Sequence, residues 1–150
     1  FGAAERHARD IIARDPNLWA GRINLAQALA AQQRFDEALA ETAEAMRLDG
    51  NTKGLTLRGY ILARMGRTAE ARAALREAET LTSDGFFPPY TSAVIHAGLG
   101  DADGLFAALD RAYAVRDANL VFLPVDPKMD PFRDDPRFRA LLDRCGFVRP

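Results

Sequence analysis

An internal repeat of 33 or 34 residues is the feature that most constrains this chain of 150 residues. Equivalent positions recur at two points of each unit, namely at Ala45, Ala78 and Ala112, and at Gln33, Gly66 and Gly100. Each unit holds two segments with the apolar spacing of an amphipathic helix. A period of this length with two helical segments per unit predicts stacked helical hairpins.

The composition agrees with an all-α fold. The chain has 28 alanines and 18 arginines, but only five valines and five isoleucines. Good helix formers are therefore abundant, and the β-branched residues that favour strands are scarce. We expect helices over residues 2–14, 18–32, 35–47, 52–65, 68–81 and 102–116, and one that starts near Pro88-Pro89 and ends near Leu99.

The small residues of the repeat resemble those of the tetratricopeptide (TPR) family. Two pairs of small residues stand where helices of a hairpin approach closely, Ala26 with Ala38 and Gly59 with Ala71. The third unit keeps Ala93 but has Leu105 in place of the second alanine, and the aromatic positions of the family pattern match poorly. The resemblance implies one all-α domain over 1–150, a TPR-like helical-hairpin solenoid with a partial repeat at 1–18 and repeats at 19–51, 52–85 and 86–119.

Residues 120–150 do not continue the repeat, because prolines interrupt them. Three Asp-Pro pairs each place a capping carboxylate before a residue suited to the first helical position, at Asp126-Pro127, Asp130-Pro131 and Asp135-Pro136. We expect a wrapping segment over 120–134 and a capping helix over 136–145. Together, residues 120–150 would cover the open end of the stack.

This tail also resembles the C-terminal end of TPR arrays in bacterial multidomain regulators. The motifs that carry the resemblance are Leu99-Gly100-Asp101, Val125-Asp126-Pro127, Asp130-Pro131-Phe132-Arg133 and Asp135-Pro136-Arg137-Phe138. In such regulators, winged-helix DNA-binding, nucleotide-cyclase or protein-kinase domains precede the array. The resemblance, and a first residue that is Phe1 instead of Met, imply the C-terminal part of a larger protein.

Charge and hydropathy argue against binding of nucleic acid or membrane by this chain. The formal net charge is −1, so no global basic field attracts a polyanion. No stretch approaches the 18 consecutive apolar residues that would span a bilayer, and no signal peptide is evident. We therefore expect a cytoplasmic protein.

No catalytic, cofactor or metal site is predicted. His96 has no histidine or cysteine at helical spacing, and Cys145 has no evident base beside it, so both fit a structural role. The aspartates between 126 and 135 lack the spacing of a calcium loop, and helix capping explains them better. We expect no enzymatic activity and no cofactor.

A peptide-binding groove is the predicted site, because the family lines its concave face with the first helix of each hairpin. None of the fifteen positions that map to this face is acidic. Nine of them are the candidate binding residues: Ile23, Gln27, Lys53, Thr56, Tyr60, Arg64, Phe87, Tyr90 and Val94. Alternatively, part of this set packs against residues 120–134.

The sequence thus predicts a protein-interaction or regulatory module. Its partner would be a protein or peptide, acidic or carboxyl-terminated, with aliphatic or aromatic anchors. The alternative function is structural self-association, in which the groove or the open N-terminal edge builds a homodimer.

Overall fold

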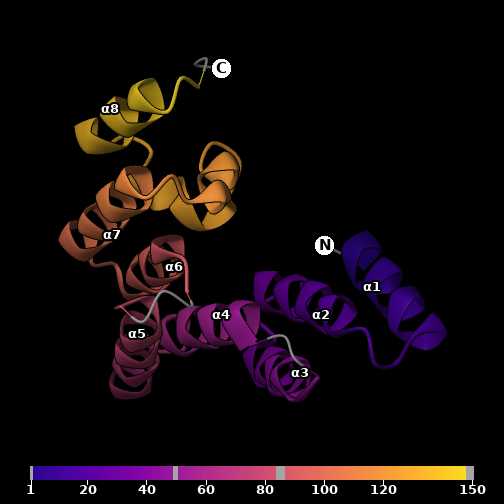
Figure 1. The fold of residues 1–150 in the computed structure, drawn as a ribbon. Helices are drawn as coiled ribbons and strands as arrows, with labels where there is room; N and C mark the ends of the chain where they lie inside the picture. Colours follow the sequence, from indigo (N-terminus) through magenta and orange to yellow (C-terminus); the bar gives the residue numbers. More distant parts are fainter. Residues whose placement is uncertain (1, 49–50, 84–86, 148–150) are drawn as a thin grey trace. The chain divides into compact units, whose positions relative to one another are not determined.

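A computed structural model describes residues 2–48, 51–83 and 87–147, and all the regular structure in these ranges is helical. Figure 1 shows the helices in chain order. Their bounds are α1 Gly2–Arg14, α2 Trp19–Ala31, α3 Phe35–Arg47, α4 Asn51–Arg64, α5 Thr68–Ser83, α6 Pro89–Leu99, α7 Ala102–Ala114 and α8 Pro136–Arg144. Two 3-10 helices, η1 Ala118–Phe122 and η2 Pro127–Phe132, lie between α7 and α8. The predicted all-α fold is confirmed.

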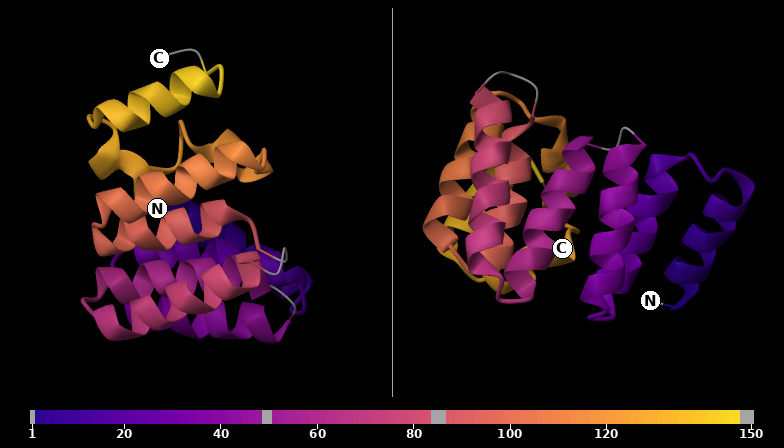
Figure 2. Two further views of the ribbon diagram at one scale, coloured as in Figure 1. Left: turned by 60° about the vertical axis from the view of Figure 1, so that its left-hand side comes forward. Right: turned by 90° about the horizontal axis from the view of Figure 1, so that it is seen from below.

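The chain divides into two compact units, which are described separately. Unit 1 runs from Phe1 to Ala74 and unit 2 from Leu75 to Pro150, so the boundary falls inside α5. In unit 1, α2 packs against α1, α3 and α4. In unit 2, α6 packs against α7 and η2, and α7 packs against α8. Figure 2 shows α8 following the η1–η2 segment at the C-terminal end of unit 2.

The helices that open each predicted repeat end in the same way. After α2, α4 and α6 the backbone turns left-handed, at Gln33, Gly66 and Gly100, where φ is 61°, 76° and 69°. The next N–H then donates to the carbonyl five residues back, in Arg34 to Leu29, Arg67 to Leu62 and Asp101 to His96. These bonds have the 6→1 pattern of a Schellman motif. The same turn and hydrogen bond also follow α7, at Arg116, and α8, at Gly146, so this helix end is common to both units.

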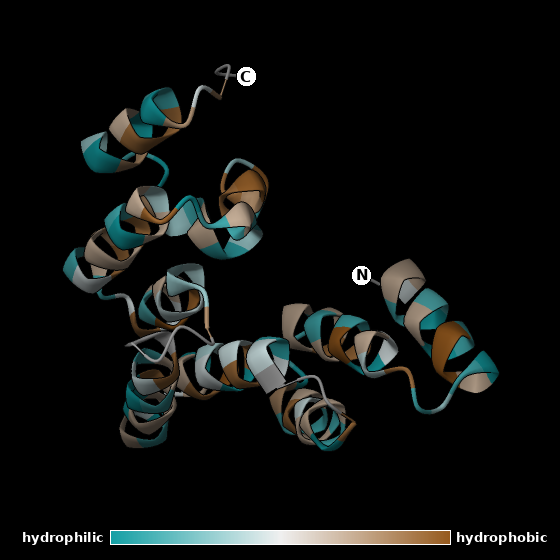
Figure 3. Ribbon diagram, viewed as in Figure 1, coloured by the Kyte–Doolittle hydropathy of each residue, from teal (hydrophilic) through white to brown (hydrophobic). Residues whose placement is uncertain are grey.

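Small residues at the repeated positions are buried. Ala45, Ala78 and Ala112 have no exposed surface, and neither have Ala38 and Ala71. In unit 1 the core cluster also contains larger side chains from α2 and α4, namely Ile23, Leu25, Leu29, Leu57 and Ile61. Figure 3 shows hydrophobic and hydrophilic residues alternating around the helices, as expected for amphipathic helices.

The C-terminal segment packs on unit 2, since η2 contacts α6 and α8 contacts α7. Phe132, Phe138 and Leu141 are buried, as are Leu105 and Leu109 of α7, whereas Leu142 is half-buried and Tyr113 is 37% exposed. Asp126 and Asp135 accept hydrogen bonds from the backbone N–H groups of Lys128 and Arg137 and so cap η2 and α8. The capping role predicted for Asp130 is wrong. Its Asp-Pro pair lies inside η2, whose N-terminus Asp126 already caps.

Candidate peptide-binding surface

The predicted site residues of unit 1 lie on α2 and α4. Ile23 and Gln27 belong to α2, and Lys53, Thr56, Tyr60 and Arg64 belong to α4; we call these six residues the α2–α4 face. The two helices pack against each other. Ile23 is buried within the core cluster, and Tyr60 packs against that cluster from its edge. Ile23 thus supports the surface from below and offers little area to a ligand.

On α4 the candidate residues follow one stripe of the helix. Positions 53, 56, 60 and 64 are separated by three, four and four residues, the spacing that places side chains above one another. Lys53 and Arg64 are exposed, whereas Thr56 and Tyr60 are half-buried. We call these four residues the α4 stripe. Gln27 of α2 is also exposed.

Tyr60 and Arg64 are brought together at the C-terminal end of the stripe. The Arg64 Nη1 donates to the Tyr60 hydroxyl over 3.0 Å. The guanidinium carbon lies 5.9 Å from the centre of the phenol ring. A guanidinium carries five N–H donors in a planar fork and can hold a carboxylate with two of them. This pair can therefore receive a carboxylate beside an aromatic surface.

The hydroxyl of Thr56 has a structural partner within its own helix. Its Oγ1 donates to the carbonyl of Thr52 over 2.6 Å. Such back-bonding to the preceding turn is common for threonine in helices. Thr56 therefore presents mainly its methyl group and the acceptor side of its hydroxyl at the middle of the stripe.

Acidic residues occur in every second helix along the chain from α1 to α7. No aspartate or glutamate occurs in the sequences of α2, α4 or α6. The helices α1, α3, α5 and α7 contain eleven of the 21 acids of the chain. The fifteen mapped groove positions lack acids, and so do the whole sequences of these three helices. On α4 it leaves three basic residues, Lys53, Arg58 and Arg64.

The predicted site residues of unit 2 are placed differently. Phe87, Tyr90 and Val94 are all buried, and every residue of α6 from 89 to 97 is buried with them. The tail covers this part of α6, since η2 packs against it. Of the three, Tyr90 bonds to the segment 120–134, through its hydroxyl and Asp126. Because all three are buried, none offers an open binding surface.

Asp117, which follows α7, and Asp126 of the tail both bond to Tyr90. The backbone N–H of Tyr90 donates to Asp117 Oδ2 over 3.0 Å, and its hydroxyl donates to Asp126 Oδ2 over 3.2 Å. Burial, and then the negative charge of Asp126, raise the pKa of the Tyr90 phenol. Asp117 also caps the N-terminus of α6, where Pro88 supplies no side-chain acceptor.

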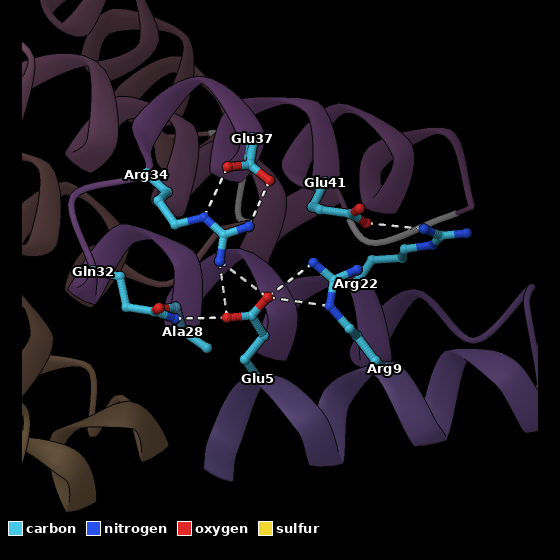
Figure 4. Close-up of polar contacts among 8 residues, drawn as sticks. All are labelled: Glu5, Arg9, Arg22, Ala28, Gln32, Arg34, Glu37 and Glu41. Atoms are coloured by element: carbon cyan, nitrogen blue, oxygen red, sulfur yellow. Dashed lines mark hydrogen bonds and ion pairs between the residues drawn. The ribbon is translucent and has the colours of Figure 1, made fainter. Parts of the chain in front are cut away.

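A cluster of charged side chains joins α1 to the first hairpin, and the sequence alone did not reveal it. Figure 4 shows the carboxylate of Glu5 in α1 accepting hydrogen bonds from Arg34, Gln32 and Arg9. The Arg34 Nη1 lies 2.9 Å from Glu5 Oε2, and the opposite side of the same guanidinium bonds to Glu37. Hydrogen bonds from Gln32 and then Arg9 lower the pKa of Glu5 to about 2.

Part of this cluster has a sequence signal, an arginine followed three residues later by a glutamate at the start of α3 and of α5. Arg34 pairs with Glu37, and Arg67 pairs with Glu70, each three residues ahead and each at 2.7 Å. The same pair thus recurs at a spacing of 33 residues. The contact of Arg34 with Glu5 spans 29 residues and has no such local signal.

His96 and Cys145, the two residues examined as catalytic or metal-binding candidates, have contacts that fit a structural role. His96 is buried, and its Nδ1 lies 2.9 Å from Asp101 Oδ2, while Asp101 Oδ1 accepts from the N–H of Gly104 and caps α7. Cys145 is half-buried, and burial raises the pKa of its thiol, which disfavours the nucleophilic thiolate. Among the described residues, no three His, Cys, Asp or Glu side chains gather as metal ligands would.

Comparisons with known proteins leave the family open. Neither the protein-family models, nor the curated proteins, nor the solved structures that were searched contain a match to this chain. Within the described ranges, no helix has the length and apolar character needed to cross a bilayer. The α2–α4 face therefore has to be interpreted from its own geometry and charge.

Proposed function

We propose that the chain is a TPR-like helical-hairpin solenoid that acts as a protein-interaction module. Two repeated features support the hairpin interpretation. One is the left-handed turn with its 6→1 hydrogen bond after α2, α4 and α6. The other is the set of buried alanines at 33- or 34-residue intervals, at Ala45, Ala78 and Ala112. In repeat proteins of this type, stacked units form extended surfaces that bind other proteins.

The α4 stripe is the observation that carries the functional proposal. It combines two exposed cations, Lys53 and Arg64, with the half-buried ring of Tyr60. Neither helix contributes an acid of its own, because the sequences of α2 and α4 contain no aspartate or glutamate. Arginine and tyrosine are enriched among the residues that dominate binding energies at interfaces. The favoured partner is a protein or peptide with a carboxylate and an apolar anchor.

The tail motifs support a regulatory setting for this binding. They resemble the end of TPR arrays in bacterial multidomain regulators, so we place the chain at the C-terminal part of a larger cytoplasmic protein. The chain would act by binding and would need no cofactor. An upstream domain would supply any enzymatic or DNA-binding step.

A charge reversal on the stripe tests this proposal. A partner is first captured on the wild-type chain and then titrated against the variant Arg64→Glu. We expect the affinity to fall at least about tenfold, since a hydrogen bond to a charged group contributes about 1.5–3 kcal/mol. Arg72→Glu is the matched control, because Arg72 is an exposed residue of α5. Equal losses from both variants, or no loss from either, would contradict the proposal.

Self-association is the second candidate function, and an exposed apolar patch of unit 2 favours it. Val121, Phe122 and Val125 follow one another closely in the tail and are 60%, 51% and 72% exposed. Large exposed apolar side chains that cluster in this way are typical of protein contacts. Light scattering across a hundredfold range of concentration would detect a dimer, and Phe122→Ser should abolish it. A constant monomer mass would rule this function out.

A further inference from the structure

The imidazole ring of His96 lies between two carboxylates of unit 2. Its Nδ1 is 2.9 Å from Oδ2 of Asp101, in the turn between α6 and α7, and its Nε2 is 3.9 Å from Oε1 of Glu79 in α5. The first distance is that of a hydrogen bond, whereas the second suits an ion pair once the ring is charged. His96 itself is only 8% exposed. One buried ring is thus in contact with groups from two different parts of the unit.

The carboxylate on the Nδ1 side is held firmly in place. Asp101 Oδ1 accepts a hydrogen bond from the N–H of Gly104 over 3.0 Å, and the Asp101 N–H donates to the carbonyl of His96 over 3.1 Å. Gly104 leaves the space that the ring occupies, since a Cβ there would meet both His96 and the Asp101 carboxylate. Because a carboxylate only accepts, the Nδ1 of His96 keeps its proton in both charge states. The ring therefore gains and loses its second proton at Nε2.

The carboxylate on the Nε2 side is able to respond to that proton. The side chain of Glu79 is 45% exposed. A protonated Nε2 donates toward Glu79 Oε1 and attracts its charge, whereas a bare Nε2 turns a lone pair toward the same oxygen. Arg76 is exposed one turn earlier on α5, at a spacing that offers the carboxylate another partner when the ring is neutral. The contact between Glu79 and His96 thus depends on the charge of the ring.

Charged groups on the other elements around α6 are directed elsewhere. Asp103 of α7 bonds to Arg137 of α8 over 2.7 Å. In η2, Asp126 accepts from Lys128 and from Tyr90, which precedes His96 by six residues or about 9 Å along the helix. The sequence of α6 contains no other charged residue. Asp101 and Glu79 are therefore the charged groups that face the ring.

We propose that His96 is a pH-sensitive clasp of unit 2, in which protonation of Nε2 ties Glu79 of α5 to the turn between α6 and α7. Histidine is the side chain that ordinarily changes its charge between pH 5 and pH 8. The clasp is closed on the acidic side, where Nε2 donates to Glu79, and it opens as the pH rises and that proton is lost. It lies outside the α4 stripe, so it stands or falls separately from the proposed function.

The carboxyl ¹³C resonance of Glu79 reports the clasp directly. It is recorded on the full chain between pH 5 and pH 8.5, together with the ring resonances of His96. We expect the Glu79 signal to show a step that follows the His96 titration and disappears in His96→Gln. His7→Gln is the matched control and should keep the step, because His7 is the other histidine of the chain and is exposed on α1. A wild-type signal without the step, or a step that survives in His96→Gln, would overturn the proposal.

Thermal unfolding tests the clasp without altering the buried ring. Glu79→Gln keeps the shape of the side chain and removes its charge, and Glu77→Gln at an exposed position of α5 is the control. We expect Glu79→Gln to lower the melting temperature by about 2–4 °C at pH 5.5 and by less than about 1 °C at pH 8.5, as for loss of a partly exposed ion pair. The control should have the same effect at both pH values. An equal effect of Glu79→Gln at both pH values would show that its contact with His96 does not depend on the charge of the ring.

Discussion

The α4 stripe of unit 1 and the equivalent face of α6 in unit 2 share a position in the repeat but differ in what covers them. On α6, two aspartates that follow α7 bond to Tyr90, and residues 89 to 97 are all buried. On α4, Lys53 and Arg64 are exposed beside the half-buried Tyr60. The comparison shows that one acid-free helix is completed by an acidic segment of its own chain. The other, which has more positive charge, presents the same positions on the surface.

The largest effect should follow from removing the segment that covers α6. Deleting residues 118–150 would expose the apolar groups under Leu123, Met129, Phe132 and Phe138, all of which are buried. Each such side chain contributes roughly 1.5–3 kcal/mol, so their combined loss approaches the whole stability of a domain. We expect aggregation or unfolding of unit 2 on size exclusion and circular dichroism. A monomer with an unchanged melting temperature would show that the tail does not stabilise unit 2.

Single truncations in the tail should separate buried anchors from the exposed patch. Leu123→Ala removes a fully buried side chain and should cost about 2–5 kcal/mol of unfolding free energy. Val125→Ala, two residues away, removes a side chain that is 72% exposed and should change stability by less than about 0.5 kcal/mol. Urea denaturation measures both. Comparable losses would mean that the tail is held by its backbone and not by its anchors.

Adding a methyl group at one glycine in each unit should reveal how tightly neighbouring helices fit. A Cβ at Gly104 would meet the ring of His96 and the carboxylate of Asp101, which are bonded to each other. A Cβ at Gly54 would meet the Cγ of Met46, close to the Met46 backbone, and would lie 3.4 Å from the backbone oxygen of Thr42. Both changes gain about 1 kcal/mol of helix propensity. We expect both Gly104→Ala and Gly54→Ala to be destabilising by about 1–3 kcal/mol in thermal unfolding, because neither neighbour can move away freely. Unchanged stability of Gly104→Ala would contradict the packing around His96.

The two units should lose stability at opposite ends of the pH scale. In unit 1, the pKa of Glu5 is lowered to about 2 from an ordinary value of 4.5, chiefly by hydrogen bonds from Gln32 and Arg9. The folded state therefore favours the carboxylate, and its contribution is complete above pH 4.5 and lost as the pH falls toward 2. Melting curves between pH 2.5 and 6 should show a steeper loss for wild type than for Glu5→Gln. Parallel curves would show that the Glu5 cluster is not stabilising.

In unit 2 the sign is opposite, because burial and Asp126 raise the pKa of Tyr90 above its ordinary value of 10.0. The folded state favours the neutral phenol, so this contribution is present below pH 10 and declines as the pH rises further. The difference in stability between wild type and Tyr90→Phe should therefore shrink between pH 9 and pH 11. A constant difference would mean that burial and Asp126 do not raise the pKa of the Tyr90 phenol in the folded state.

Local patterns predicted the helices well. The expected helices over 2–14 and 35–47 coincide with Gly2–Arg14 and Phe35–Arg47. The later ones differ by at most two residues at their ends. This success has a physical reason, since helix ends depend on nearby caps and left-handed turns such as Gly66 and Gly100. The Asp130-Pro131 pair was misread because a local rule cannot tell which of two successive Asp-Pro pairs begins the helix.

The candidate site could be predicted only where it depends on a single helix. The positions of Lys53, Tyr60 and Arg64 are mapped from the family resemblance, and helical spacing places them on one side of α4. The burial of Tyr90 has no such signal, because its aspartate partners are 27 and 36 residues away. The contact between Glu5 and Arg34 is likewise separated by 29 residues. Contacts at such separations are set by packing of whole elements, which periodicity along the sequence does not specify.

Amide chemical shifts of the full chain, recorded while a partner peptide captured on the wild-type chain is added, test the central claim most directly. If the α4 stripe is the binding surface, shifts should change for residues 53–64 of α4 and for Gln27 of α2. Residues 89–97 of α6 should keep their shifts, because the tail of the chain already covers them. Changes confined to α6 and the tail, or no saturable change anywhere, would contradict the account.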